Sequence, residues 1–228
     1  IRDRAIHRGR QTFGNLRQAM VYTLAVHVPI IGLALLPVLF GLPLVLAPLH
    51  IAFLELVIDP ACSIVFEAEE GAADLMQQPP RAADEPLLST RHILLSVLQG
   101  SVVTAAVVGL YAWLLRQPAH AATASTAAFV VLVAANAALI LPSRSSQTVW
   151  RSLWKGLTPV SLWVAGGTLA ALTAITTVPW LANAFRFVPL SPLHWFMALL
   201  AGLLLTVVFA ANKRWLQPTA PALHPSPA

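Results

Sequence analysis

The chain has 228 residues, of which 57% are hydrophobic and only 10% are charged. Its mean hydropathy of +0.74 lies far from that of a water-soluble domain and predicts an all-α, polytopic membrane protein. The single cysteine, Cys62, excludes an internal disulfide and a cysteine-ligated metal cluster. The net charge of +5 is explained below by membrane topology, so it indicates an anionic lipid surface and no nucleic-acid partner.

The first 18 residues are basic and polar. They open on Ile1, without an initiator Met, a secretory signal or an acylation motif. We therefore expect the sequence to be a piece of a longer protein, with segment 1–18 forming a cytoplasmic stalk.

Six segments are apolar over about 20 residues, the length that a transmembrane helix needs. They are residues 19–40, 44–66, 92–115, 124–142, 158–181 and 192–211. Twelve of the 14 Lys and Arg residues flank these spans on one side, which leaves Arg116 and Arg186 on the other. Because cytoplasmic loops hold the excess of positive charge, we expect six transmembrane helices with both termini cytoplasmic.

The connections divide these spans into groups. The residues "GLPL" predict a tight hairpin that makes the first two spans, within 19–66, antiparallel neighbours. Residues 67–91 are polar, acidic and rich in proline, as in a solvated cytoplasmic loop. We expect a four-helix bundle over 92–211 and a cytoplasmic tail over 212–228, which is rich in Pro and Ala.

The first span contains "HVPIIG", in which His27 precedes Pro29 by two residues. We expect a helix interruption here, because proline lacks the backbone donor that a helix needs. His27 is a ligand, a proton acceptor or a hydrogen-bonded core histidine, and the pattern alone does not choose among these roles.

The second span, "HIAFLELVIDPACSIVFE", carries two acids within the membrane, Glu55 and Asp59. Each costs roughly 2.5 to 3.5 kcal/mol to insert, so a compensating group is required. The acids are four residues apart and share one helix face, where a cation would relieve their repulsion and compete with protons for their oxygens. Pro60 frees the carbonyl of Leu56 as a further ligand. The alternative is a kinked helix whose acids bond to neighbouring polar side chains.

Two other polar residues lie in or near the spans. His50 stands at the outer entrance of the second span, and we expect it at the membrane interface. Asn136, within "LVAANAALIL", lies deep in the fourth span. An isolated amide at that depth is more typical of a helix–helix contact than of a ligand.

Three motifs together resemble the C-terminal membrane part of cation-transporting P-type ATPases, from the fifth to the tenth transmembrane helix. They are "GRQTFGNLRQAMVY" before and into the first span, "GLPLVLAPLHIAFLELVIDPACSIVFE" through the second, and "LMQQPPR" in the loop that follows. The resemblance implies that the first two spans build an ion site together with a broken fourth helix that this sequence does not contain.

The resemblance places four residues at cation-ligand positions of calcium pumps. They are His27, Glu55, Asp59 and Asn136. Ile30 and Ile58 stand where that family has Glu and Thr ligands, so the transported cation is left unassigned. The form of the second span is similar to a bacterial branch of these pumps, which implies a location in the bacterial inner membrane.

The sequence has neither the aspartyl phosphorylation motif nor the dephosphorylation motif of these pumps, and "GDG" does not occur. We therefore expect the chain alone not to hydrolyse ATP, and the resemblance assigns Mg-ATP to catalytic domains that precede Ile1. The residues leave two other functions open: a stand-alone ion or proton-coupled secondary carrier, and a non-transporting scaffold or fragment.

Overall fold

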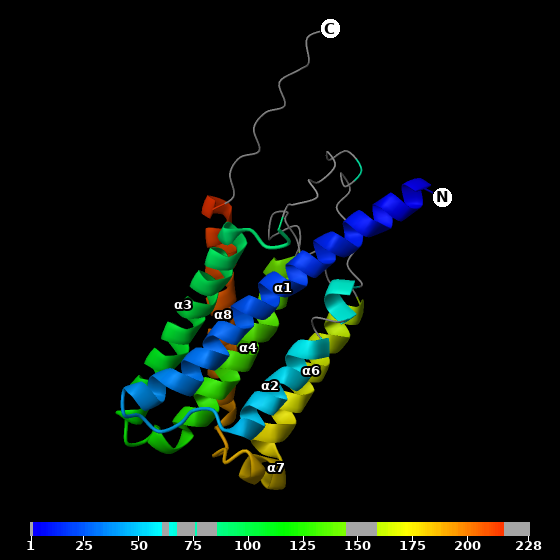
Figure 1. The fold of residues 1–228 in the computed structure, drawn as a ribbon. Helices are drawn as coiled ribbons and strands as arrows, with labels where there is room; N and C mark the ends of the chain where they lie inside the picture. The colour runs from blue at the N-terminus through cyan, green and yellow to red at the C-terminus, as the bar shows by residue number, and fades with distance from the viewer. Residues whose placement is uncertain (1, 61–63, 68–75, 77–85, 145–158, 217–228) are drawn as a thin grey trace.

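The structure, a computed structural model, describes residues 2–60, 64–67, 76, 86–144 and 159–216. This part of the chain is all-α (Figure 1). Its helices are α1 (Arg2–Leu39), α2 (Pro48–Pro60), α3 (Thr90–Leu115), α4 (Ala124–Arg144), α6 (Pro159–Thr177), α7 (Pro179–Ala184) and α8 (Pro192–Leu216), with the 3₁₀ turn η2 (Ala121–Thr123) before α4.

Each of the six predicted spans overlaps a helix of the described structure, although the span predicted over 158–181 covers both α6 and α7. Four helical segments are long and apolar enough to cross a membrane: Asp3–Leu39, Thr90–Leu115, Ala121–Ile140 and Pro159–Thr177. The apolar parts of α2 and α8, Pro48–Ile58 and Pro192–Leu205, are shorter. The protein is thus an integral membrane protein with about four to six spanning helices in its described part.

Helix α1 is continuous from Arg2 to Leu39, with Pro29 and Pro37 inside it. The predicted interruption at "HVPIIG" is therefore wrong. A membrane helix tolerates proline where neighbouring elements pack on the carbonyl that loses its donor. For Pro29 that carbonyl belongs to Ala25, and Gly100 of α3 lies directly against it. At about 1.5 Å per residue, α1 is ~57 Å long, nearly twice the hydrocarbon thickness of a bilayer, and Figure 1 shows its N-terminal part projecting beyond the other helices.

Prolines also set the ends of other helices. The span predicted over 158–181 is divided, because α6 ends at Thr177 and the short α7 begins at Pro179, directly after Val178. The residue before a proline is driven out of the helical conformation, and Val178 is extended, with φ −75° and ψ 119°. Helix α2 is described as far as Pro60, and residues 61–63 lie outside the described part, so the structure does not test whether the Leu56 carbonyl acts as a ligand.

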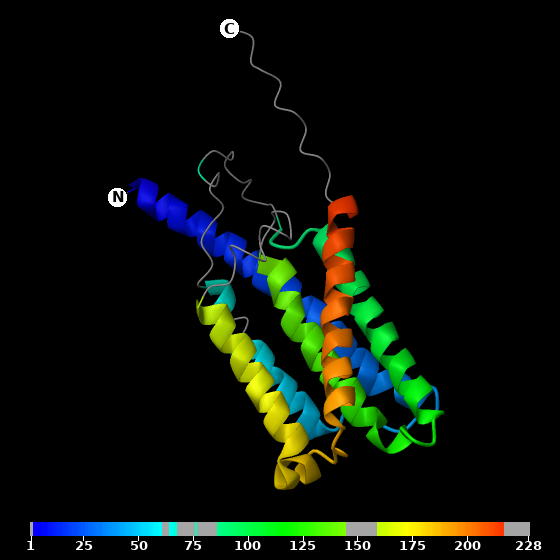
Figure 2. The same ribbon diagram turned by 180° about the vertical axis from the view of Figure 1, so that it is seen from behind.

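Helix α4 lies at the centre of the bundle and is buried along most of its length. It packs mainly on α8, and α1 packs mainly on α3. Figures 1 and 2 show α2 and α6 running side by side along one flank. The core is formed by aliphatic residues of α1, α3 and α4 and by aromatic residues such as Tyr22 and Phe129.

The connections 40–47, 116–123 and 185–191 lie together at one end of the bundle, here called the loop end (Figures 1 and 2). The start of α1 and the end of α8 lie at the opposite end. Both ends of the described chain thus lie at the same end of the bundle. Which side faces the cytoplasm is not fixed by this arrangement.

Glycines allow two of the helix contacts to be unusually close. A Cβ atom added at Gly100 would lie 2.6 Å from the carbonyl oxygen of Ala25 and 2.5 Å from the Cβ of Val28. One added at Gly202 of α8 would lie 2.6 Å from the carbonyl oxygen of Val131 in α4. Small residues at such crossings let the backbones approach, which is how helices associate in lipid.

We expect Gly100→Ala to destabilise the protein by about 1–3 kcal/mol, because the new methyl group meets backbone and Cβ atoms that cannot move aside cheaply. Gly109→Ala on the same helix is the matched control, since nothing lies within 4 Å of its added Cβ. It should be neutral or raise stability by up to ~1 kcal/mol. Thermal unfolding in detergent measures both, and equal melting temperatures would contradict the close crossing.

Candidate functional site

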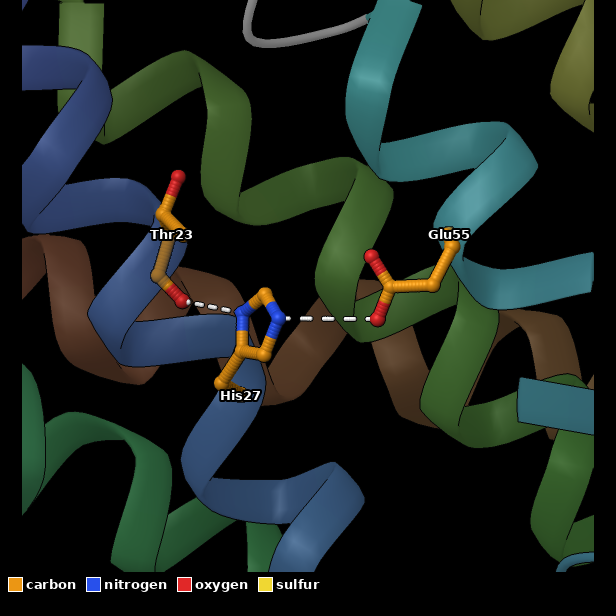
Figure 3. A network of polar contacts seen from close by, with 3 residues as sticks. All are labelled: Thr23, His27 and Glu55. Carbon is orange, nitrogen blue, oxygen red and sulfur yellow. Dashed lines mark hydrogen bonds and ion pairs between the residues drawn. The ribbon is translucent and has the colours of Figure 1, made fainter. Parts of the chain in front are cut away.

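Two of the residues singled out in the sequence come together between α1 and α2. The Nε2 atom of His27 lies 3.5 Å from Oε1 of Glu55, and Nδ1 of His27 lies 2.8 Å from the carbonyl oxygen of Thr23 (Figure 3). A carbonyl can only accept a hydrogen bond, so Nδ1 carries the proton and donates. The Thr23 carbonyl therefore fixes both the orientation of the ring and its tautomer, with Nε2 turned toward the carboxylate.

This arrangement has a definite electrostatic requirement. When the imidazole is neutral and Glu55 is ionised, a lone pair on Nε2 faces a lone pair on the carboxylate. The contact becomes favourable when one positive charge enters it, either as a proton on Nε2 or on the carboxyl group or as a cation bound by both atoms. The His27–Glu55 pair can thus hold one proton or one cation between its two facing atoms.

The pair is not enclosed by the described part of the chain. The side chains of His27 and Glu55 are 37% and 39% exposed, although both stand within apolar helices. Leu56, beside Glu55, is 68% exposed as well. The face of α1 and α2 that carries the pair therefore has room for further ligands from another segment.

Asp59 belongs to the same helix, four residues after Glu55, but its side chain lies outside the described part of the structure. The structure therefore does not test whether its carboxylate joins the pair. Within the described residues, no group of three or more His, Cys, Asp or Glu side chains converges on one point. Ile30 and Ile58 are buried in the core, with exposed fractions of 5% and 2%.

Asn136 is placed differently from the pair. It lies on α4 and is 1% exposed, and its backbone carbonyl accepts a hydrogen bond from the hydroxyl of Tyr22 at 3.3 Å. Both polar atoms of its side chain, Nδ2 and Oδ1, are buried without a hydrogen-bond partner among the described residues. The helix–helix contact predicted at this position is therefore made by the backbone, and the amide group is left available.

His50 is buried within the protein at the loop end, with an exposed fraction of 5%. The expectation that it lies at the membrane interface stays a prediction, because burial among protein side chains does not fix its depth in the bilayer. Its ring packs against Phe129, Phe185 and Phe187, at centroid distances between 4.8 and 5.5 Å. Its Nδ1 accepts a hydrogen bond from the amide of Ala47 at 2.8 Å. Its Nε2 has no partner of good hydrogen-bond geometry, although the backbone of Phe185 lies close by. No sequence signal links residue 50 to residues 185–187, because the cluster is assembled only by tertiary packing.

A comparison with known families finds one match, described as "Cation transporting ATPase, C-terminus", over residues 43–215. Among curated proteins, the chain is 30% identical over 218 residues to a calcium-transporting ATPase of Bacillus subtilis. It is 26% identical over 213 residues to a probable cation-transporting ATPase F of Mycobacterium tuberculosis, and 26% identical over 219 residues to the cation-transporting ATPase pma1 of Synechocystis. These alignments cover 89–92% of this chain but only 23–24% of each relative.

The unpartnered amide of Asn136 leads to a stability prediction. A buried polar group without a partner costs about 1–3 kcal/mol, so Asn136→Leu should leave the melting temperature unchanged or raise it when no transported ion is present. Tyr22→Phe is the comparison variant, since it removes one hydroxyl that has a partner and should lower stability by about 1 kcal/mol. A marked loss of stability in Asn136→Leu would show that the amide is bonded within the protein.

Proposed function

Since the chain belongs to the C-terminal membrane domain family of the cation-transporting P-type ATPases, we propose that it binds the transported cation with intramembrane carboxylates. The observation that carries the proposal is the contact between His27 and Glu55. In the whole pump, catalytic domains that precede Ile1 would bind Mg-ATP and drive the transport.

The separation within the pair suits a shared cation. Two ligand atoms that each lie ~2.1 Å from one ion, and 3.5 Å from each other, subtend an angle of roughly 110° at that ion. The same separation is too long for a strong direct hydrogen bond. Protons and cations would therefore compete for the pair, and release of the cation would be coupled to uptake of a proton.

Two further residues would supply the remaining ligands. Asp59, four residues after Glu55 on α2, would add a second carboxylate, and Asn136, whose amide has no hydrogen-bond partner among the described residues, would add a neutral oxygen from α4. Hard cations favour such oxygen donors. The exposed flank of the pair provides space for another helix of the pump to complete the coordination.

Helix α1 links this site to the region where the catalytic domains would attach. It runs without a break from Arg2 to the ion-site residue His27 and on to Leu39. We propose that segment 1–18 is a stalk that carries motion to the site. The four helices over 92–211, which correspond to α3, α4, α6 and α8, would form a support on which α1 and α2 rest.

The two acids can be tested in the full-length pump. Asp59→Asn keeps the shape of the side chain but removes its charge, and we expect it to abolish cation-activated phosphorylation. Glu55→Gln should lower the apparent cation affinity about tenfold, or ~1.4 kcal/mol, and flatten its dependence on pH because one competing proton site is lost. Phosphoenzyme formation is measured against cation concentration across a pH series.

Glu67→Gln is the matched control, since Glu67 is an exposed carboxylate that follows α2. It should retain the cation and pH dependence of the wild type. If Asp59→Asn and Glu55→Gln also fold and retain it, the two acids are structural and the cation binds elsewhere. Cation uptake by the isolated chain without ATP would instead favour a secondary carrier.

We also propose that both termini face the cytoplasm of a bacterial cell and that the loop end faces outward, on the basis of the Lys and Arg distribution. In a Cys62→Ala background, Arg186→Cys should react with a membrane-impermeant maleimide from outside intact cells. Arg91→Cys, at the start of α3, should react only after the cells are opened. Labelling of both positions from the same side would contradict this topology.

A further inference from the structure

A pair of histidines, His120 and His194, lies at the loop end, away from the His27–Glu55 pair. His120 belongs to the connection between α3 and α4, and His194 to the first turn of α8. Their ring centroids are 5.1 Å apart and their planes are inclined by 74°. Figure 2 shows the start of α8 next to the α3–α4 connection. Neither residue was singled out in the sequence, because 74 positions separate them.

From this geometry we propose that His120 and His194 form a binding site for a transition-metal dication such as Zn²⁺ or Cu²⁺. Imidazole nitrogens bind zinc at ~2.0–2.1 Å, and the ring centre lies ~1.1 Å farther out. Two rings on one tetrahedral ion therefore have centroids roughly 5.2 Å apart, which agrees with the 5.1 Å in the structure. The separation of the two rings is therefore the one that a shared ion requires.

The structure holds both residues ready for this role. The backbone of His120 is fixed in a turn, since its amide donates to the carbonyl of Gln117 at 2.9 Å and its own carbonyl accepts from the amide of Thr123 at 3.0 Å. On His194, Nδ1 lies 2.8 Å from the hydroxyl oxygen of Ser191. A metal-binding histidine commonly engages its second nitrogen in such a bond, which orients the ring and leaves Nε2 for the ion.

The two histidines are accessible to solvent, so a bound metal ion could exchange with ions in solution. His194 is exposed and His120 is partly exposed, so the ion can enter from solvent and water can fill the other coordination positions. Imidazole selects zinc, copper and nickel over magnesium and calcium. The bound ion would tie the α3–α4 connection to the start of α8, and so hold three helices together at the loop end.

His92 offers a matched comparison within the same chain. Both Ser89–His92 and Ser191–His194 place a histidine three residues after a serine whose hydroxyl accepts the histidine amide hydrogen bond, at 3.4 and 3.3 Å. Only His194 faces a second histidine among the described residues. Glutamine can replace the histidine in such a capping arrangement, so His→Gln removes the metal ligand but keeps the helix start.

The test uses the full-length protein in lipid nanodiscs with Cu²⁺ or Zn²⁺ alone as the probe. Electron paramagnetic resonance at one equivalent of Cu²⁺ should show two coordinated imidazoles in the wild type and in His92→Gln. His120→Gln and His194→Gln should each lose this signature, and their zinc affinity by calorimetry should fall about tenfold or more. Persistence of the two-imidazole signal in both variants would overturn the site, as would its absence from the wild type.

A measurement without substitutions guards against misfolded variants. Zn²⁺ should protect His120 and His194 of the wild type from diethyl pyrocarbonate, while His7, exposed near the start of α1, reacts at its normal rate. Mass spectrometry of the peptides reads the modification at each position. Equal reaction of His120 and His194 with and without zinc would show that their contact is only an aromatic one.

Discussion

A bilayer offers no hydrogen-bond partner, so every polar group within these helices must find one in the protein or bear the cost of lacking it. Several threonine hydroxyl groups find this partner within their own helix. Thr104 and Thr176 donate to the carbonyls four residues before them, at 2.8 and 2.7 Å. Tyr111 reaches across to the carbonyl of Pro43 at 3.0 Å, which ties α3 to the α1–α2 connection. Against this background, polar groups without partners are conspicuous.

The exceptions are concentrated in a few places. The amide of Asn136 has no partner within the part of the chain that the structure describes, and the His27–Glu55 contact is favourable only when a positive charge enters it. An ion bound as proposed above would supply the partner that these groups lack. Its binding would then recover part of the stability that the unpartnered groups cost.

Much of the architecture could be predicted from the sequence, since runs of about 20 apolar residues admit few structures other than membrane helices. The ends of α3 and α4 agree with the predicted spans to within two residues. Ser89 caps the start of α3, and the polar connection 116–123 separates the end of α3 from the start of α4. The proline rules were less reliable. Pro179 divides the span predicted to be continuous over 158–181. Pro29 does not interrupt its helix, and a glycine 71 positions away in α3 packs on the carbonyl that lacks a donor.

The candidate site was only partly accessible to prediction. Glu55 was evident because an acid in an apolar helix is rare, but a lone histidine at position 27 gave no indication of its partner. The tautomer of His27 depends on the carbonyl of Thr23, and that follows from the helix geometry of α1 itself. The aromatic surroundings of His50 and the pairing of His120 with His194 depend on contacts between distant segments, which periodicity cannot reveal.

The unbroken course of α1 has a mechanical consequence, because a continuous helix tilts as one rod. His27 lies 25 positions after Arg2 on this one helix, or ~38 Å along its axis. If the helix pivots at its N-terminal end, near Arg2, a tilt of only about 5° moves the ring by ~3 Å, given that length. That displacement is comparable to the 3.5 Å between His27 and Glu55. A small rotation of a stiff helix is thus enough to open or close the contact, without any local unfolding at Pro29.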